Sequence, residues 1–202
     1  MGVTFDDTEK KFVFDFEHDG AEDIVSLTGT GYQVEAFGKC FYYGYEFSEQ
    51  VDSSVRTAFI KYVKFTESLQ DTPDLTNFIK KAIDNLHKKI NLYNYDLVVM
   101  PESSSKVNQY MLRYIYRFAQ PTLFKMTLVK ALPSNISFDM KSEEERDLCA
   151  SIRKQNVLVI DDITTSGSTL NEVLRTLRIL NEDNDITIFS LIGRKDLMAE
   201  SV

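Results

Sequence analysis

The chain has 202 residues, of which 43% are hydrophobic and 27% are charged, a balance that suits a globular protein with a single core. Its formal charge of −8 argues against sequence-independent nucleic-acid binding, which needs clustered Lys and Arg. No apolar run is as long as a bilayer span and residues 1–11 show no signal-peptide pattern, so we expect a cytoplasmic protein without a membrane anchor. Cys40 and Cys149 stand apart without metal-ligand spacing, which is typical of free thiols in a reducing compartment.

The first fifty residues differ from the rest of the chain in composition and in the pattern of apolar residues. The segment 11–20 alternates phenylalanines with polar residues and ends in Asp-Gly, a pattern typical of a half-buried strand and a turn. The segment 29–47 is rich in glycine and aromatic residues and predicts further short antiparallel strands. We therefore expect a small N-terminal β-rich region over residues 1–50, serving as a hood or a docking surface, and an α/β core over residues 51–202.

Two helices are expected next. Residues 53–68 repeat apolar side chains at helical spacing, and residues 72–90 carry a longer apolar stripe behind a proline near the start. The stripe of the second helix consists of Leu75, Phe78, Ile79, Ala82, Ile83, Leu86 and Ile90. His87 lies off this stripe beside lysines, so we expect its side chain to be solvated.

From residue 95 onward, short apolar strands alternate with helices. Strands are expected at 95–100, 122–129, 157–162 and 185–193, with helices after the first and third of them. A long polar segment, 130–156, separates the two halves and ends in a charged helical stretch. The alternation predicts right-handed crossovers and an α/β fold: an open, mostly parallel sheet with helices on both faces.

The stretch VLVIDDITTSGSTL, residues 157–170, joins an apolar strand to two acids, a hydroxyl-rich loop and an amphipathic helix. A P-loop hydrolase would also need the pattern GxxxxGK[ST]. The nearest segment, 31–40, has six residues between its glycines and places Cys40 where the hydroxyl should be. A phosphoacceptor receiver domain has paired acids at its first strand, and too little chain follows Asp161 to complete that fold. Neither alternative fits.

A third interpretation uses the whole stretch. Backbone N–H groups at a helix start form a nest for an anion, and Gly167 lets the backbone approach an oxygen closely. Hydroxyl donors around this glycine are Thr164, Thr165, Ser166, Ser168 and Thr169. The carboxylates of Asp161 and Asp162 can accept hydrogen bonds from vicinal hydroxyls one sugar-length away. The stretch therefore predicts a site for a phosphorylated ribose.

The same stretch resembles the phosphoribosyl-pyrophosphate (PRPP) binding motif of type I phosphoribosyltransferases. The resemblance implies that Asp161 and Asp162 engage the ribose hydroxyls and act in catalysis, while residues 164–169 hold the 5′-phosphate. It further implies that a nitrogenous base displaces pyrophosphate from PRPP. Mg²⁺ is the implied cofactor, bound through substrate oxygens and water and not by direct protein ligands.

Further similarities lie outside this motif. The loop after strand 95–100 takes the place of the family's pyrophosphate loop, and segment 130–156 matches its mobile active-site loop. Residues at these two places that could stabilise the departing pyrophosphate are Ser103, Ser104, Ser105, Lys106, Lys130 and Lys141. The Asn-Gln at 108–109 and the aromatic strand and helix over 41–65 resemble the competence-associated, ComF-like branch.

Two departures bear on the activity. Thr165 stands where purine-salvage members carry an acid that serves as general base, and residues 101–106 lack the arginines that the ComF-like branch usually has there. The alternatives are therefore a PRPP-dependent transferase, a non-catalytic sensor of PRPP or a nucleotide, and a subunit of a larger assembly. The expected partner is PRPP or a nucleotide, with a homodimer or an assembly partner left open, and the sequence does not specify the acceptor base.

Overall fold

The structure, a computed structural model, describes part of the chain. Its described residues are 2–6, 8–9, 11–15, 25–27, 40–46, 53–66, 72–101, 105–118, 122–126, 128–132, 135–138, 154–164, 167, 169–170, 172–174, 177 and 183–193.

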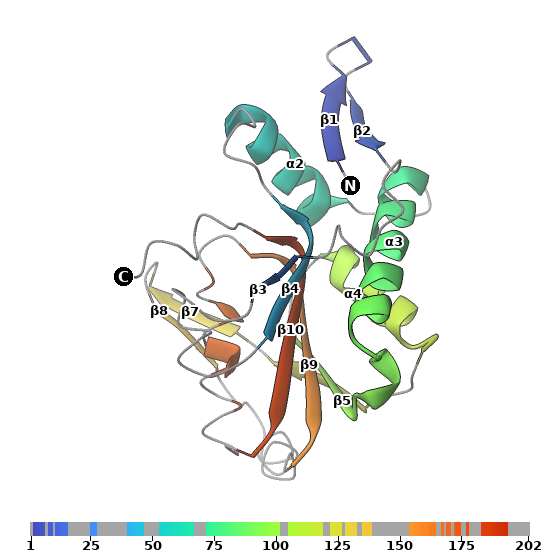
Figure 1. The fold of residues 1–202 in the computed structure, drawn as a ribbon. Coiled ribbons are helices and arrows are strands. Elements are labelled where there is room, and N and C mark those ends of the chain that lie inside the picture. Colours follow the sequence, from blue (N-terminus) through green and yellow to red (C-terminus); the bar gives the residue numbers. More distant parts are fainter. Residues whose placement is uncertain are drawn as a thin grey trace.

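A mostly parallel sheet forms the centre of the described structure (Figure 1). Its strand order is β3–β4–β10–β9–β5–β6, and every neighbouring pair is parallel except β3 and β4. The strands are β3 (Val25–Leu27), β4 (Cys40–Glu46), β5 (Leu97–Pro101), β6 (Thr122–Met126), β9 (Asn156–Ile163) and β10 (Asp185–Gly193). The apolar runs of the inner strands explain this placement, because a strand covered on both faces has no polar side.

Two small antiparallel pairs stand apart from this sheet. One joins β1 (Gly2–Asp6) to β2 (Lys11–Asp15), where the sequence predicts a strand from its alternating phenylalanines. The other joins β7 (Leu128–Leu132) to β8 (Asn135–Phe138), inside the segment that the sequence presents as a polar loop. Each pair forms its own two-stranded sheet, and neither pair adds a strand to the central sheet.

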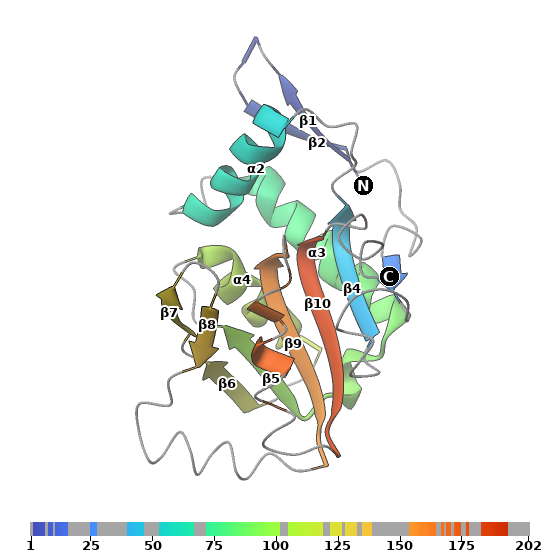
Figure 2. The same cartoon turned by 90° about the vertical axis from the view of Figure 1, so that its left-hand side faces the viewer.

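Helices cover both faces of the central sheet, as the sequence predicts. On one face lie α3 (Pro73–Lys89) and α4 (Lys106–Ile115), and on the other lies a helical segment whose described residues fall within 169–177 (Figure 2). Helix α2 (Ser53–Phe65) lies above the carboxyl ends of the strands and contacts β9 and α4. None of the helices that the structure describes combines the length and the apolar character needed to cross a bilayer.

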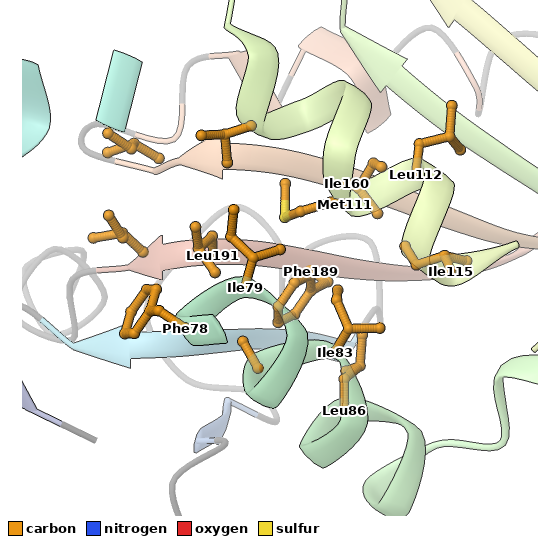
Figure 3. Packing of buried hydrophobic residues seen from close by; sticks show 14 of the residues in the cluster. Phe78, Ile79, Ile83, Leu86, Met111, Leu112, Ile115, Ile160, Phe189 and Leu191 are labelled. Carbon is orange, nitrogen blue, oxygen red and sulfur yellow. The ribbon is translucent and has the colours of Figure 1, made fainter. Parts of the chain in front are cut away.

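The core lies between the sheet and the helices α3 and α4 (Figure 3). Strands β9 and β10 contribute Leu158, Ile160, Phe189 and Leu191, and the two helices contribute Phe78, Ile79, Ile83, Leu86, Met111, Leu112 and Ile115. Each of these side chains is at most 6% exposed, and full burial of one such side chain stabilises the fold by about 1.5–3 kcal/mol. The predicted stripe of α3 is confirmed, and this packing makes the end of β9 a rigid platform.

Three sequence predictions differ from the structure. Residues 122–129 do not form one strand, because β6 ends at Met126 and β7 begins a separate hairpin at Leu128. The segment 29–47, predicted to form short antiparallel strands, contributes β4 to the central sheet. There β4 is parallel to β10 and antiparallel only to β3. The described part of segment 130–156 contains the β7–β8 pair, which its polar composition did not indicate.

His87 also differs from its prediction, since its ring is half-buried and not solvated. The short helix η2 (Leu92–Asn94) turns back after α3, and the Leu92 N–H donates to His87 Nδ1 at 3.2 Å. The ring of Phe118 stacks on the imidazole at 4.3 Å between centroids. The imidazole therefore accepts a hydrogen bond from the chain just after α3, a role that helical spacing alone does not reveal.

Candidate functional site

The order of the strands marks one place at the carboxyl edge of the sheet. From β5 the chain passes through α4 to β6 on one side, and from β9 it passes through the 169–177 helical segment to β10 on the other side. The connections of these two adjacent strands thus run in opposite directions. Open α/β sheets bind ligands at such a switch point, outside the carboxyl ends of the strands.

The two strands also separate there. The β5–β9 pairing is recorded from Leu97↔Val157 to Val99↔Val159, although β9 continues to Ile163. The acids Asp161 and Asp162 lie on this last part of β9, and both are buried, at 7% and 4% exposed. The carboxyl ends of β5 and β9 therefore lie next to each other at this edge of the sheet, where the sequence interpretation expects the site.

The acidic pair is held by the backbone that follows it. The Asp162 N–H donates to Asp161 Oδ1 at 2.9 Å, and the Ile163 N–H donates to Asp162 Oδ1 at 2.8 Å. These bonds fix one oxygen of each carboxyl group. A carboxylate has about four lone-pair sites, so each group keeps capacity to accept further hydrogen bonds.

Burial makes this pair electrostatically unfavourable. Loss of solvation raises the pKa of Asp161 well above its ordinary value, and the neighbouring charge of Asp162 raises it further. The Asp162 N–H bond and the Lys64 ammonium act in the opposite direction. Two adjacent buried acids at a sheet switch point, one of them with a raised pKa, are typical of a binding or catalytic site, since a purely structural pair would gain nothing from such burial.

Lys64 was not among the residues that the sequence singled out. It lies in the last turn of α2, a helix that contacts β9, and the charge of its exposed side chain acts on Asp161 from another element. Among the described residues, the other charged group that acts on Asp161 is Asp162 on the same strand. The contact between α2 and β9 could be found only from the fold.

We expect Lys64→Gln to lower the thermal unfolding midpoint (Tm) at pH 7 by about 1–3 °C, a small effect because the ammonium is exposed. Lys64 holds the raised pKa of Asp161 down, so its removal destabilises the protein only where Asp161 is ionised. The loss should vanish near pH 4 and grow as the pH rises through the pKa of Asp161. Lys61→Gln, on the exposed side of the same helix, is the control, and an equal loss there at all pH values would contradict the pairing.

The phosphate loop after β9 is described in part. Gly167 is buried and has φ 70°, the left-handed region that favours glycine, and Thr169 lies in the helical segment that follows. Thr164 is buried, its N–H donates to the Ile192 carbonyl at 2.9 Å, and its hydroxyl bonds that of Ser190. A glycine in the left-handed region thus stands between the acids and the helical segment that begins by Thr169. Thr165, Ser166 and Ser168 lie outside the described residues.

The loop after β5 is described only at its end. Ser105 is buried and caps α4, with Val107 N–H donating to its Oγ at 3.3 Å, while Lys106 is exposed in the first turn. Ser103 and Ser104 lie outside the described residues, as does Lys141. The backbone of Lys130 lies in β7 and not in a loop.

A second residue to which the sequence assigned no role is Asn108, named above only for the resemblance of 108–109 to the ComF-like branch. It belongs to the buried stripe of α4 together with Met111, Leu112 and Ile115, and it is 0% exposed. The available signal was a polar residue placed three and four positions before two core residues.

No group of three His, Cys, Asp or Glu side chains in the described part of the chain could hold a metal ion.

The chain matches no protein-family profile and no curated protein sequence. Solved structures with a similar arrangement include a purine phosphoribosyltransferase from Pyrococcus horikoshii Ot3, with 14% identity over 58% of this chain and 84% of that one, at a TM-score of 0.45. A hypoxanthine phosphoribosyltransferase from Staphylococcus aureus shares 17% identity over 68% and 77% of the two chains, at a TM-score of 0.46. The Trypanosoma cruzi hypoxanthine phosphoribosyltransferase in complex with IMP gives 15% identity, 60% and 66% coverage and a TM-score of 0.44. These similarities are weak, with TM-scores below 0.5 and identities below 20%.

Proposed function

We propose that the protein binds PRPP, or another ribose 5-phosphate, as its Mg²⁺ complex and transfers the phosphoribosyl group to a nitrogenous base. The observation that carries the proposal is the buried pair Asp161 and Asp162, which lies in the last part of β9 at the switch point and is followed along the chain by Gly167 in the left-handed region. A phosphorylated ribose offers an anion for the turn and vicinal hydroxyls for the acids. Few other ligands meet both demands at this spacing.

The described residues would divide the ligand between them. Backbone N–H groups around Gly167 and the helix start after it would bind the 5′-phosphate, where the helix dipole favours negative charge. Asp161 and Asp162 would accept hydrogen bonds from the ribose hydroxyls. Their negative charge would also favour the positive charge that develops on the sugar ring when the bond from C1 to pyrophosphate breaks. Catalysis would then come from positioning and from charge.

The leaving pyrophosphate would face the start of α4. Lys106 is exposed there, and the Ser105 cap orients the turn that the diphosphate would approach. Mg²⁺ would enter as part of the substrate complex, coordinated by phosphate oxygens and water, because it keeps waters and rarely uses a full protein cage. The roles of Ser103, Ser104, Lys130 and Lys141 stay predictions.

A non-catalytic sensor of the same ligand is the second candidate. Thr165 cannot accept a proton at neutral pH, so this chain has no acid at the position where purine-salvage members carry a general base. The segment 101–106 has no arginine to neutralise a leaving diphosphate. Both features affect turnover more than binding. The similarity to the ComF-like branch, a homodimer and an assembly partner likewise stay predictions.

Calorimetry with Mg–PRPP and with ribose 5-phosphate, followed by pyrophosphate release with a panel of nitrogenous bases, tests the proposal. We expect both ligands to bind and at least one base to release pyrophosphate. Binding without turnover on any base would support the sensor and reject the transferase. If neither ligand binds with or without Mg²⁺, the loop after β9 only caps a helix and the proposed function is wrong.

A further inference from the structure

Asn108 carries a buried side-chain amide for which the described residues provide no hydrogen-bond partner. It lies in the first turns of α4, on the stripe that faces the core, and it is 0% exposed. Neither its Nδ2 nor its Oδ1 has a hydrogen-bond partner among the described residues. Burial of an unpaired amide is costly and rare in native cores, and a leucine at this position would continue the stripe. Asn108 therefore calls for a role other than packing.

The other side-chain atom in this state is Oδ2 of Asp162. It is buried and has no hydrogen-bond partner among the described residues, while Oδ1 of the same group accepts from the Ile163 N–H. An amide N–H donates and a carboxylate oxygen accepts, so the two unpaired groups are chemically complementary. Their positions in the fold decide whether they can meet.

The packing of α4 on β9 brings them together. Met111 and Ile160 belong to one core cluster and lie side by side on facing elements (Figure 3). Helix α4 connects two parallel strands, so it runs antiparallel to β9. Moving toward the carboxyl edge, three residues back along α4 give Asn108, a rise of about 4.5 Å. Two residues forward along β9 give Asp162 on the same face as Ile160, a rise of about 6.6 Å. This register places both residues at the carboxyl edge of the sheet, on the face of β9 that α4 covers.

We propose that Asn108 is a positioning residue of the ribose site: when a ribose 5-phosphate is bound, its Nδ2 donates to Oδ2 of Asp162 and fixes that carboxylate for the ribose hydroxyls. The proposal rests on the proposed function. Such bonds are often long or absent without ligand and tighten in the complex. Because Asn108 follows the Ser105 cap by three residues, the bond also ties the ribose end of the ligand to the loop that would hold its diphosphate.

The test compares Asn108→Leu with Asn108→Asp and with a matched control, Asn85→Leu. Asn85 is also a buried asparagine on a helix of the same face, but its Oδ1 accepts from Lys88 Nζ at 3.3 Å. Asn108→Leu removes an unpaired amide, so we expect Tm to rise by about 2–4 °C. The dissociation constant for ribose 5-phosphate should nevertheless rise at least ~10-fold, the loss of one charge-assisted hydrogen bond.

The two other variants separate donation from shape. Asn108→Asp keeps the shape but removes the donor and adds a charge beside Asp162, so it should bind ribose 5-phosphate more weakly than Asn108→Leu. Asn85→Leu should lower Tm and leave the dissociation constant unchanged. The proposal is overturned if Asn108→Leu lowers Tm and binds normally, since Asn108 would then be structural only.

Failure of the proposed function is distinguishable from failure of this inference. If wild-type protein binds neither ribose 5-phosphate nor Mg–PRPP, the proposed function is wrong; if wild type binds and Asn108→Leu binds equally well, only this inference is wrong. Asn108→Asp combined with Asp162→Asn restores one donor and one acceptor in exchanged positions. In a double-mutant cycle of ribose 5-phosphate binding, an affinity above the sum of the two single effects supports the pairing, and strictly additive effects reject it.

Discussion

Replacement of both Asp161 and Asp162 by asparagine is expected to weaken binding of ribose 5-phosphate at least ~100-fold while the protein stays folded. Each carboxylate would lose its charge-assisted bond to a ribose hydroxyl, and such bonds contribute about 1.5–3 kcal/mol each. Two bonds at the lower limit give about 3 kcal/mol, which corresponds to about 100-fold in affinity. Calorimetry measures the affinity, and far-UV circular dichroism checks the fold.

The single variant Asp161→Asn gives an independent check in the absence of ligand. Burial and the charge of Asp162 raise the pKa of Asp161, so the folded state holds this proton more tightly than the unfolded state does. That contribution to stability is complete below the unfolded pKa of about 4 and is lost as the pH rises through the raised pKa of the folded state. Asparagine mimics the protonated form without titrating. The variant should thus have a higher Tm than wild type at pH 8, with the two curves meeting near pH 4.

A different result would remove the basis of the site. If Asp161→Asn lowers Tm at every pH, the carboxylate is a stabilising part of the strand end and not a strained group kept for a ligand. If the double variant binds ribose 5-phosphate as wild type does, the acids do not contact the sugar. Higher stability together with lost binding is the pattern expected of residues kept for function.

The elements that the sequence predicts well are those with strong local periodicity. The apolar stripe of α3 and the strand 185–193 agree with the structure. The spacing in α3 matches a helix with one buried face, and the run at 185–193 matches a strand that is buried on both faces. The strand before the acids was also predictable from its apolar run, although β9 continues through Asp161 and Asp162 to Ile163 and stays buried there. Local pattern thus determines which residues enter the site from β9.

Contacts between distant elements were not predictable in the same way. Nothing in the spacing of α2 indicates that Lys64 acts on Asp161, because that depends on how a helix crosses the strand ends. The sequence shows Asn108 as a polar residue on an apolar helical stripe. Its proposed role could not be inferred without knowing how α4 packs on β9. The β7–β8 pair is held by local hydrogen bonds between short segments with little apolar periodicity, so composition alone suggests a loop.

Gly167 can serve two purposes: it allows the positive φ of the backbone, and its lack of a Cβ leaves space for the phosphate. Variants can separate these two effects. We expect Gly167→Ala to destabilise the protein by about 1–2 kcal/mol, because a Cβ at φ 70° clashes with the chain. It should also weaken ribose 5-phosphate binding more than ~10-fold, since the same Cβ fills the space next to the phosphate oxygens.

Gly167→Asn isolates the second effect. Asparagine tolerates positive φ better than alanine, so this variant should recover much of the Tm that Gly167→Ala loses. Its side chain still occupies the nest, so its affinity for ribose 5-phosphate should stay low. If the affinity instead recovers together with Tm, then Gly167 serves only the turn, and the phosphate is bound elsewhere on the carboxyl edge of the sheet. Recovery of stability without recovery of binding would locate the 5′-phosphate at this glycine, directly beyond the buried acids.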